Sequence, residues 1–188
     1  MTTTNKFLER IKEHREGKKT EKFSGTLSEY LERLEANPDI ASLAHRRLYE
    51  QILSHGLTTL DETDTRCNKI FDGDEVKVYD YFASQFFGME RPLEKVMRFL
   101  RSAAMKGEES RQVLLLLGPV GAGKSALVEH IKGALEKCDP IYVLDGCPIR
   151  EEPLHLIPRS LREEFTEAYG IKIEGDLCPV CRHRLINE

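Results

Sequence analysis

The chain has 188 residues, of which 40% are hydrophobic and 32% are charged, and its formal net charge at pH 7 is −4. This size and balance fit one ordinary globular domain, or a small domain with part of another. They exclude the strongly basic surface of a general nucleic-acid-binding protein, and no apolar run approaches the roughly 18 residues of a membrane span. We therefore expect neither a nucleic-acid nor a membrane partner.

The N-terminus predicts a cytoplasmic protein. Residues 1–6 are polar and lack the apolar core of a signal peptide. Five cysteines in such a chain fit reduced thiols better than a disulfide framework. Lys, Glu and Arg dominate residues 5–20, so this stretch is interpreted as a solvated helix.

A helical hairpin is predicted next. Thr26 and Glu29 match a capping box, in which the hydroxyl and the carboxylate bind backbone N–H groups reciprocally. A second helix is expected to begin at Asn37-Pro38 and to run to Leu53. Residues 57–75 are polar and turn-rich, which is typical of a linker. Residues 1–75 are thus interpreted as a helical N-terminal region with its linker.

Residues 76–188 alternate apolar runs with helical patterns, which predicts an α/β domain. The runs 113–117 and 141–144 are too short for helices and suit parallel strands buried on both faces. Amphipathic helices are predicted after Pro92 and after Ser125. The expected fold is a P-loop NTPase with a parallel sheet flanked by helices, preceded by the helical N-terminal segment.

A phosphate-binding motif of the form G-x-x-x-x-G-K-S follows the first predicted strand directly. It consists of Gly118, Pro119, Val120, Gly121, Ala122, Gly123, Lys124 and Ser125. Its glycines let backbone N–H groups point at phosphate oxygens, and the following helix adds a partial positive charge. Lys124 is expected to reach the β- and γ-phosphates, and Ser125 to bind Mg²⁺. The motif predicts binding of a nucleoside triphosphate with Mg²⁺.

Two further patterns carry less weight. Asp145 ends an apolar run as a Walker B acid would, but it follows the P-loop helix too soon and is interpreted as a loop residue. Cys178 and Cys181 form a C-x-x-C pair near His183, which offers two or three ligands where a closed zinc site needs four. Ordinary reduced cysteines, half of a zinc site and a redox pair all stay open. Cys138 and Cys147 would join the pair only if the chain folds back.

From about residue 23 onward the chain resembles the N-terminal part of the bacterial PrkA-type serine protein kinases, which carry an AAA+ domain. The most particular shared stretch is Pro153-Leu154-His155-Leu156-Ile157-Pro158. Glu152, directly before that stretch, is shared as well. The other shared stretches are the P-loop and residues 25–31, 44–49, 87–90, 146–148 and 169–177.

The resemblance implies that the nucleotide is ATP and that Phe87, Gly88 and Met89 lie near the adenine. It implies a serine protein kinase or ATPase in a longer protein. This chain shows no evident Walker B acid, arginine finger or kinase region, and it is interpreted as a truncated member, a fragment or a diverged short gene product. Its own enzymatic activity, its protein substrate and its assembly into a homo-oligomer stay open. The alternatives are a non-catalytic ATP-dependent interaction module and a small-metabolite kinase. The second is disfavoured because more than one hundred residues precede the P-loop.

Overall fold

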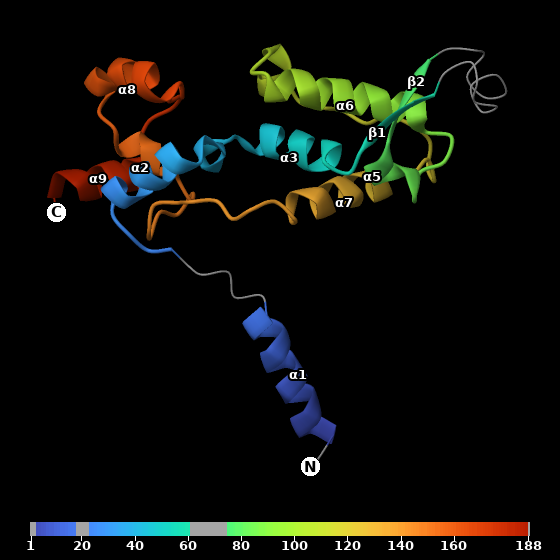
Figure 1. The fold of residues 1–188 in the computed structure, drawn as a ribbon, viewed down its shortest axis with the longest axis horizontal. Helices are drawn as coiled ribbons and strands as arrows, with labels where there is room; N and C mark the ends of the chain where they lie inside the picture. Colours follow the sequence, from blue (N-terminus) through green and yellow to red (C-terminus); the bar gives the residue numbers. More distant parts are fainter. Residues whose placement is uncertain (1–2, 18–22, 61–74, 188) are drawn as a thin grey trace. The chain divides into compact units, whose positions relative to one another are not determined.

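The computed structural model describes residues 3–17, 23–60 and 75–187 (Figure 1). The chain forms two compact units. Unit 1 combines Met1–Pro38 with Leu144–Glu188, and unit 2 is the continuous stretch Asp39–Val143. The predicted boundary between residues 75 and 76 adjoins a stretch outside the described residues and stays a prediction. Within the described ranges, the helices are all too short or too polar to cross a membrane.

Unit 2 is built around three helices and a small sheet. Its elements are α3 (Ala44–Leu53), β1 (Leu57–Leu60), β2 (Val76–Tyr79), α5 (Asp80–Ala83), α6 (Glu90–Ala104), the 3-10 helix η2 (Glu108–Arg111) and α7 (Lys124–Leu135). Helix α3 contacts both α6 and α7 and lies between them in Figure 1. Helix α6 also contacts β2, so the helices pack with the sheet around the main core of the unit.

The apolar face of α6 supplies much of that core, as its 3.6-residue period predicts. Leu93, Met97 and Leu100 are buried on it. They cluster with Phe82, Phe86, Leu127 and Ala134 and with other apolar side chains of α3, α5 and α7. Because Leu127 and Ala134 lie on α7, burying them fixes the helix whose first turn follows the phosphate-binding motif.

The sheet differs from the parallel one expected from the sequence. Among the described residues it has two antiparallel strands, with Leu57 opposite Tyr79 and Leu60 opposite Val76. The runs 113–117 and 141–144 have no strand assignment. A strand is stabilised by hydrogen bonds to a neighbouring strand, and the described residues provide neither run with one. Val113, Leu115 and Leu117 are accordingly 90%, 71% and 84% exposed.

The helix predicted from Pro38 to Leu53 is interrupted. A 3-10 helix, η1, spans Pro38–Ala41, and α3 begins only at Ala44. Leu43 between them has an extended backbone, with φ −67° and ψ 155°. The apolar period continues through the break, so the sequence pattern by itself did not reveal it.

Unit 1 joins two distant parts of the sequence. Its elements are α1 (Thr3–Gly17), α2 (Leu27–Ala36), the 3-10 helices η3 (Pro153–Leu156) and η4 (Arg159–Leu161), α8 (Arg162–Tyr169) and α9 (Pro179–Asn187). The predicted capping box is present: the Thr26 N–H donates to Glu29 Oε2 at 2.6 Å, and the Glu29 N–H donates to Thr26 Oγ1 at 3.4 Å. The Tyr30 hydroxyl on α2 donates to Glu152 Oε1 at 2.7 Å, which connects the two parts.

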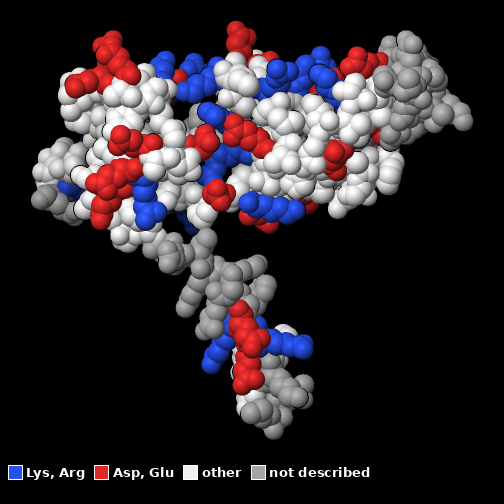
Figure 2. Space-filling model, in the orientation of Figure 1, with Lys and Arg blue, Asp and Glu red and all other residues white. Residues whose placement is uncertain are grey.

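The surface carries both signs of charge. Figure 2 shows acidic and basic side chains interspersed over much of the face in view, with Lys and Arg gathered over α6. Helix α6 contributes Arg91, Lys95, Arg98 and Arg101. The expectation that the chain binds no nucleic acid stays a prediction.

Candidate functional site

The phosphate-binding motif forms a tight loop that runs directly into α7. Gly121 and Gly123 have φ values of +82° and +75°, in the left-handed region that side chains with a Cβ rarely adopt. Helix α7 begins at Lys124, the residue after Gly123. The N–H groups of its first turn have no acceptor within the helix. The glycine conformations therefore place several backbone donors and a helix N-terminus at one point, as an anion site requires.

Lys124 bends back over the loop that precedes it. Its Nζ donates to the Gly118 carbonyl at 2.8 Å and to the Pro119 carbonyl at 2.6 Å. These two neutral acceptors hold the ammonium group beside the loop. Ser125, in the next position of α7, is exposed. The charged and hydroxyl groups of the motif thus lie at the same end of α7.

The segment before α6 lies beside the motif. A Cβ atom placed on Gly123 would lie 3.7 Å from Sδ of Met89, so the two residues are in van der Waals range. The Gly88 N–H donates to Glu90 Oε1 at 3.3 Å, which closes the turn into α6. Phe87 is 80% exposed. The structure therefore brings Met89 to the motif and leaves the Phe87 ring at the surface.

Asp145 lies in a turn and is exposed, as the interpretation of a loop residue expects. It belongs to unit 1, whereas the phosphate-binding motif belongs to unit 2. Two arginines of unit 1 are paired with an acidic side chain of the same unit. Arg159 binds the Asp176 carboxylate, and Arg162 Nη1 lies 3.7 Å from Asp176 Oδ1.

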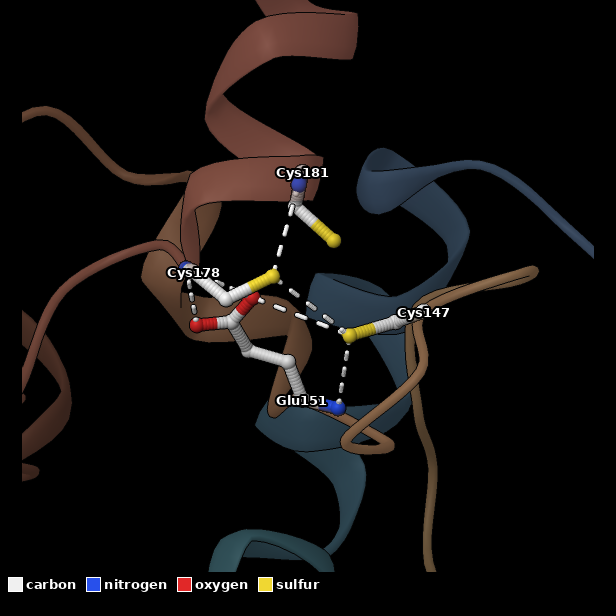
Figure 3. Close-up of side chains that lie close together, drawn as sticks. All are labelled: Cys147, Glu151, Cys178 and Cys181. Atoms are coloured by element: carbon white, nitrogen blue, oxygen red, sulfur yellow. Dashed lines mark hydrogen bonds between the residues drawn. The ribbon is translucent and has the colours of Figure 1, made fainter.

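Unit 1 holds a second group of reactive side chains. Cys178 and Cys181 of the predicted C-x-x-C pair meet Cys147 and Glu151, and the four ligand atoms all lie within 4.8 Å of one another (Figure 3). Cys147 comes from the turn after residue 144, while Cys181 lies in α9. His183 is exposed and is not part of the group.

Sequence reasoning named Cys147 only as a cysteine that would join the pair if the chain folded back, which it does, and it missed Glu151. The spacing C-x-x-x-E of these two residues is only a weak signal of a metal site. Cys147 and Glu151 are 31 and 27 positions away from Cys178, so the local sequence does not indicate the contact. Burial by itself would raise the pKa of Glu151, but hydrogen bonds from His155 and Cys178 outweigh it and hold the pKa below its ordinary value. Burial raises the pKa of Cys181 to about 12.

Comparison with known proteins identifies the class. The family model of the PrkA AAA domain matches residues 25–188. The chain is thus an ATP-binding portion of an AAA-type protein, and AAA domains have the α/β fold of P-loop NTPases. More particularly, the chain belongs to the PrkA family, as the resemblance in its sequence predicted. No solved structure matches it.

Two relatives illustrate the range of the family. A Bacillus subtilis (strain 168) protein named ATP-dependent protease PrkA is 37% identical over 187 residues, which cover 96% of this chain and 28% of that protein. An Escherichia coli (strain K12) protein named Serine/threonine kinase YeaG is 32% identical over 163 residues, which cover 83% of this chain and 24% of that protein. The chain therefore spans about a quarter of the length of these relatives.

Proposed function

We propose that this chain binds Mg-ATP through the loop from Gly118 to Ser125, as the nucleotide-binding portion of a PrkA-type protein. The observation that carries the proposal is the arrangement at the start of α7. Two left-handed glycines, the free N–H groups of a helix N-terminus and the Lys124 ammonium converge there. Each favours a negatively charged group, and together they match the needs of a triphosphate.

The contacts of Lys124 suggest how the nucleotide enters. Its ammonium group is bound to two carbonyl oxygens, which carry no net charge. A phosphate oxygen offers a charge-assisted hydrogen bond, which is roughly twice as strong as a neutral one. ATP should therefore draw Lys124 Nζ away from Gly118 and Pro119. Ser125 follows in the helix and would supply a hydroxyl ligand to Mg²⁺.

The adenine is proposed to lie beside Met89. The contact between Met89 and Gly123 places this residue next to the phosphate-binding loop. Phe87, two residues earlier, is an exposed aromatic ring, which is a favourable surface for stacking on a base. The proposal assigns Phe87, Gly88 and Met89 to the base and the loop residues to the phosphates.

ATP binding is distinct from the reaction for which a PrkA-type protein uses ATP. The two relatives are named as a protease and as a kinase, which are different reactions. The family model describes an AAA domain, and the name of the Bacillus subtilis protein calls it ATP-dependent, so both support the use of ATP. We therefore assign nucleotide binding to this chain, and we assign neither peptide cleavage nor protein phosphorylation to it.

The substitution Lys124→Ala tests the proposal. It removes a charge-assisted hydrogen bond of about 1.5–3 kcal/mol, so we expect ATP affinity to fall by about tenfold to a hundredfold. Isothermal titration calorimetry of the purified chain with ATP and Mg²⁺ measures this. Circular dichroism should show unchanged helical content.

Lys132→Ala is the matched control, because Lys132 lies on the same helix and pairs with Glu129 at 3.0 Å, away from the loop. It should bind ATP as the unsubstituted chain does. Equal affinities of the unsubstituted chain and Lys124→Ala would refute the assignment of the site. A Ser125→Ala variant that kept its full dependence on Mg²⁺ would refute the role of Ser125.

A further inference from the structure

We propose that Cys147, Glu151, Cys178 and Cys181 form a structural zinc site within unit 1. This proposal is independent of nucleotide binding, because the four residues lie outside the unit that carries the phosphate-binding loop. Figure 3 shows the three sulfur atoms and the Glu151 carboxylate directed toward one another. The chain thus supplies four ligands, where the C-x-x-C pair alone would supply two.

Two of the distances between the ligand atoms are close to those expected around a tetrahedral ion, and all four atoms lie within 4.8 Å of one another. Two sulfur atoms that each lie about 2.3 Å from zinc, at tetrahedral angles, are about 3.8 Å apart. The Sγ atoms of Cys147 and Cys178 are 3.9 Å apart. Cys147 Sγ and Glu151 Oε2 are also 3.9 Å apart, close to the roughly 3.6 Å expected for one sulfur and one oxygen ligand. A disulfide would need a separation of about 2.05 Å.

Backbone N–H groups point at the sulfur atoms. The Glu151 N–H donates to Cys147 Sγ at 3.4 Å, and the Cys181 N–H donates to Cys178 Sγ at 3.4 Å. Such donors stabilise a thiolate, which is the form of cysteine that binds metal. The local backbone therefore favours the thiolate form of Cys147 and of Cys178.

The Glu151 carboxylate is held in place by two neighbours. The Cys178 N–H donates to Glu151 Oε1 at 2.8 Å, and His155 Nδ1 lies 3.1 Å from the same oxygen. The other ring nitrogen of His155 lies 2.9 Å from the Glu174 carbonyl oxygen, which fixes the ring. An outer group that orients a ligand in this way is a regular feature of metal sites. We assign His155 as a positioning residue.

Burial supplies a second reason for a cation. Glu151 is 5% exposed, and it is the only charged side chain that is buried among the residues that the structure describes. Cys147 and Cys181 beside it are 9% and 7% exposed. Cys178 and His155 hydrogen-bond the Glu151 carboxylate, and a metal ion would compensate the negative charge that the carboxylate and neighbouring thiolates bring together in a buried place. Zinc is the ion that thiolates select at a closed tetrahedral site with no open position.

The site would stabilise unit 1 by connecting its loops. It ties the turn at Cys147 to the start of α9 at Cys181. The described apolar core of this unit is small, consisting mainly of Tyr30, Leu34, Leu154, Ile157 and Phe165. Small units commonly need a metal or disulfides to compensate for a small core. With four protein ligands the ion has no place for a substrate, so its role is structural.

The first test is the metal content and coordination of the unsubstituted full chain, purified without chelator. Elemental analysis should find about one zinc per chain. X-ray absorption at the zinc edge should show three sulfur neighbours and one oxygen neighbour. This measurement does not depend on whether any variant folds. A chain that carries no zinc, and binds none when zinc alone is added, would overturn the proposal.

Variants locate the site. Cys147→Ser should lose the zinc, whereas Cys138→Ser, a cysteine of unit 2, should retain it. Glu151→Gln should weaken zinc binding by more than about tenfold, and the exposed Glu167→Gln should not. A chelator should lower the melting temperature of the unsubstituted chain but not that of Cys147→Ser. If Cys147→Ser keeps one zinc per chain, or the three thiols react with a thiol reagent equally fast before and after chelation, the site is wrong.

Discussion

At the scale of single residues, two glycines of one helical segment have opposite requirements. Gly123 precedes α7 with a φ of +75°. Gly133 lies inside α7, and a Cβ added there would lie 3.8 Å from the Tyr81 hydroxyl, an ordinary van der Waals distance. The first position needs a residue without a Cβ, whereas the second does not.

Substituting each glycine by alanine should change stability in opposite directions. Gly123→Ala forces a residue with a Cβ into the left-handed region and should lower the free energy of unfolding by about 1–2 kcal/mol. Gly133→Ala should raise it by about 0.5–1 kcal/mol, since glycine is less favourable than alanine inside a helix. Urea denaturation followed by circular dichroism measures both. Two variants with equal stability would contradict this account of the loop.

The residue scale also shows what the sequence could predict of the two sites. The phosphate-binding residues are contiguous, so their spacing alone predicts a loop followed by a helix, and the start of α7 lies within two residues of the predicted one. The cysteine group depends on a contact between Cys147 and Cys178, which are 31 positions apart. Nothing in the local pattern of either residue encodes that contact, because it depends on how residues 151–178 fold.

At the scale of elements, α2 shows a local signal that the structure bears out. Thr26 and Glu29 form the capping box that their spacing predicts. The pKa of Glu29 is lowered from its ordinary value of 4.5, chiefly by the hydrogen bond from the Thr26 N–H and next by the Thr26 hydroxyl. The ionised carboxylate is thus the form that stabilises the start of α2.

This linkage predicts the effect of acid on α2. Because the pKa of Glu29 is lower in the folded chain, the stabilisation is present above pH 4.5 and is lost as the pH falls through the lowered folded value. We expect Thr26→Ala to bring the Glu29 pKa closer to 4.5 and to weaken the loss of α2 at low pH. A carbon-detected NMR titration of the Glu29 carboxyl group measures the pKa. Glu32→Gln, a change outside the box on the same helix, should leave that titration unchanged.

Elements that depend on distant partners were predicted less well. The apolar period from Ile40 to Leu53 predicts one helix but does not reveal the extended backbone at Leu43. The apolar runs 113–117 and 141–144 have the composition of buried parallel strands, yet neither has a ladder partner in the described residues. The residue composition of a segment indicates which backbone conformation the segment prefers. A strand, however, also needs a neighbouring strand to which it can hydrogen-bond.

At the scale of the whole molecule, the two units differ in how far local sequence patterns predict their folds. Unit 2 is continuous, and its helices α3, α6 and α7 were each indicated by their apolar period. Unit 1 joins the first 38 residues to the last 45, a pairing that no local pattern predicts. The zinc site proposed above would act in this discontinuous unit, where chain connectivity contributes least to holding the parts together.

The exposed run at residues 113–117 leads to the last prediction, which concerns association of the chain. The exposed side chains of Val113, Leu115 and Leu117 present an apolar edge that has no strand partner among the described residues. Such an edge favours pairing with another chain. We expect the purified chain to self-associate with rising concentration in sedimentation velocity. Leu115→Lys should shift the chain toward the monomer, because a charge at an exposed strand opposes pairing.

The control is Met105→Lys, at a residue 71% exposed at the end of α6. It adds the same charge elsewhere on unit 2 and should leave association unchanged. A chain that stays monomeric at every concentration, or equal effects of the two lysines, would show that this run is not the contact.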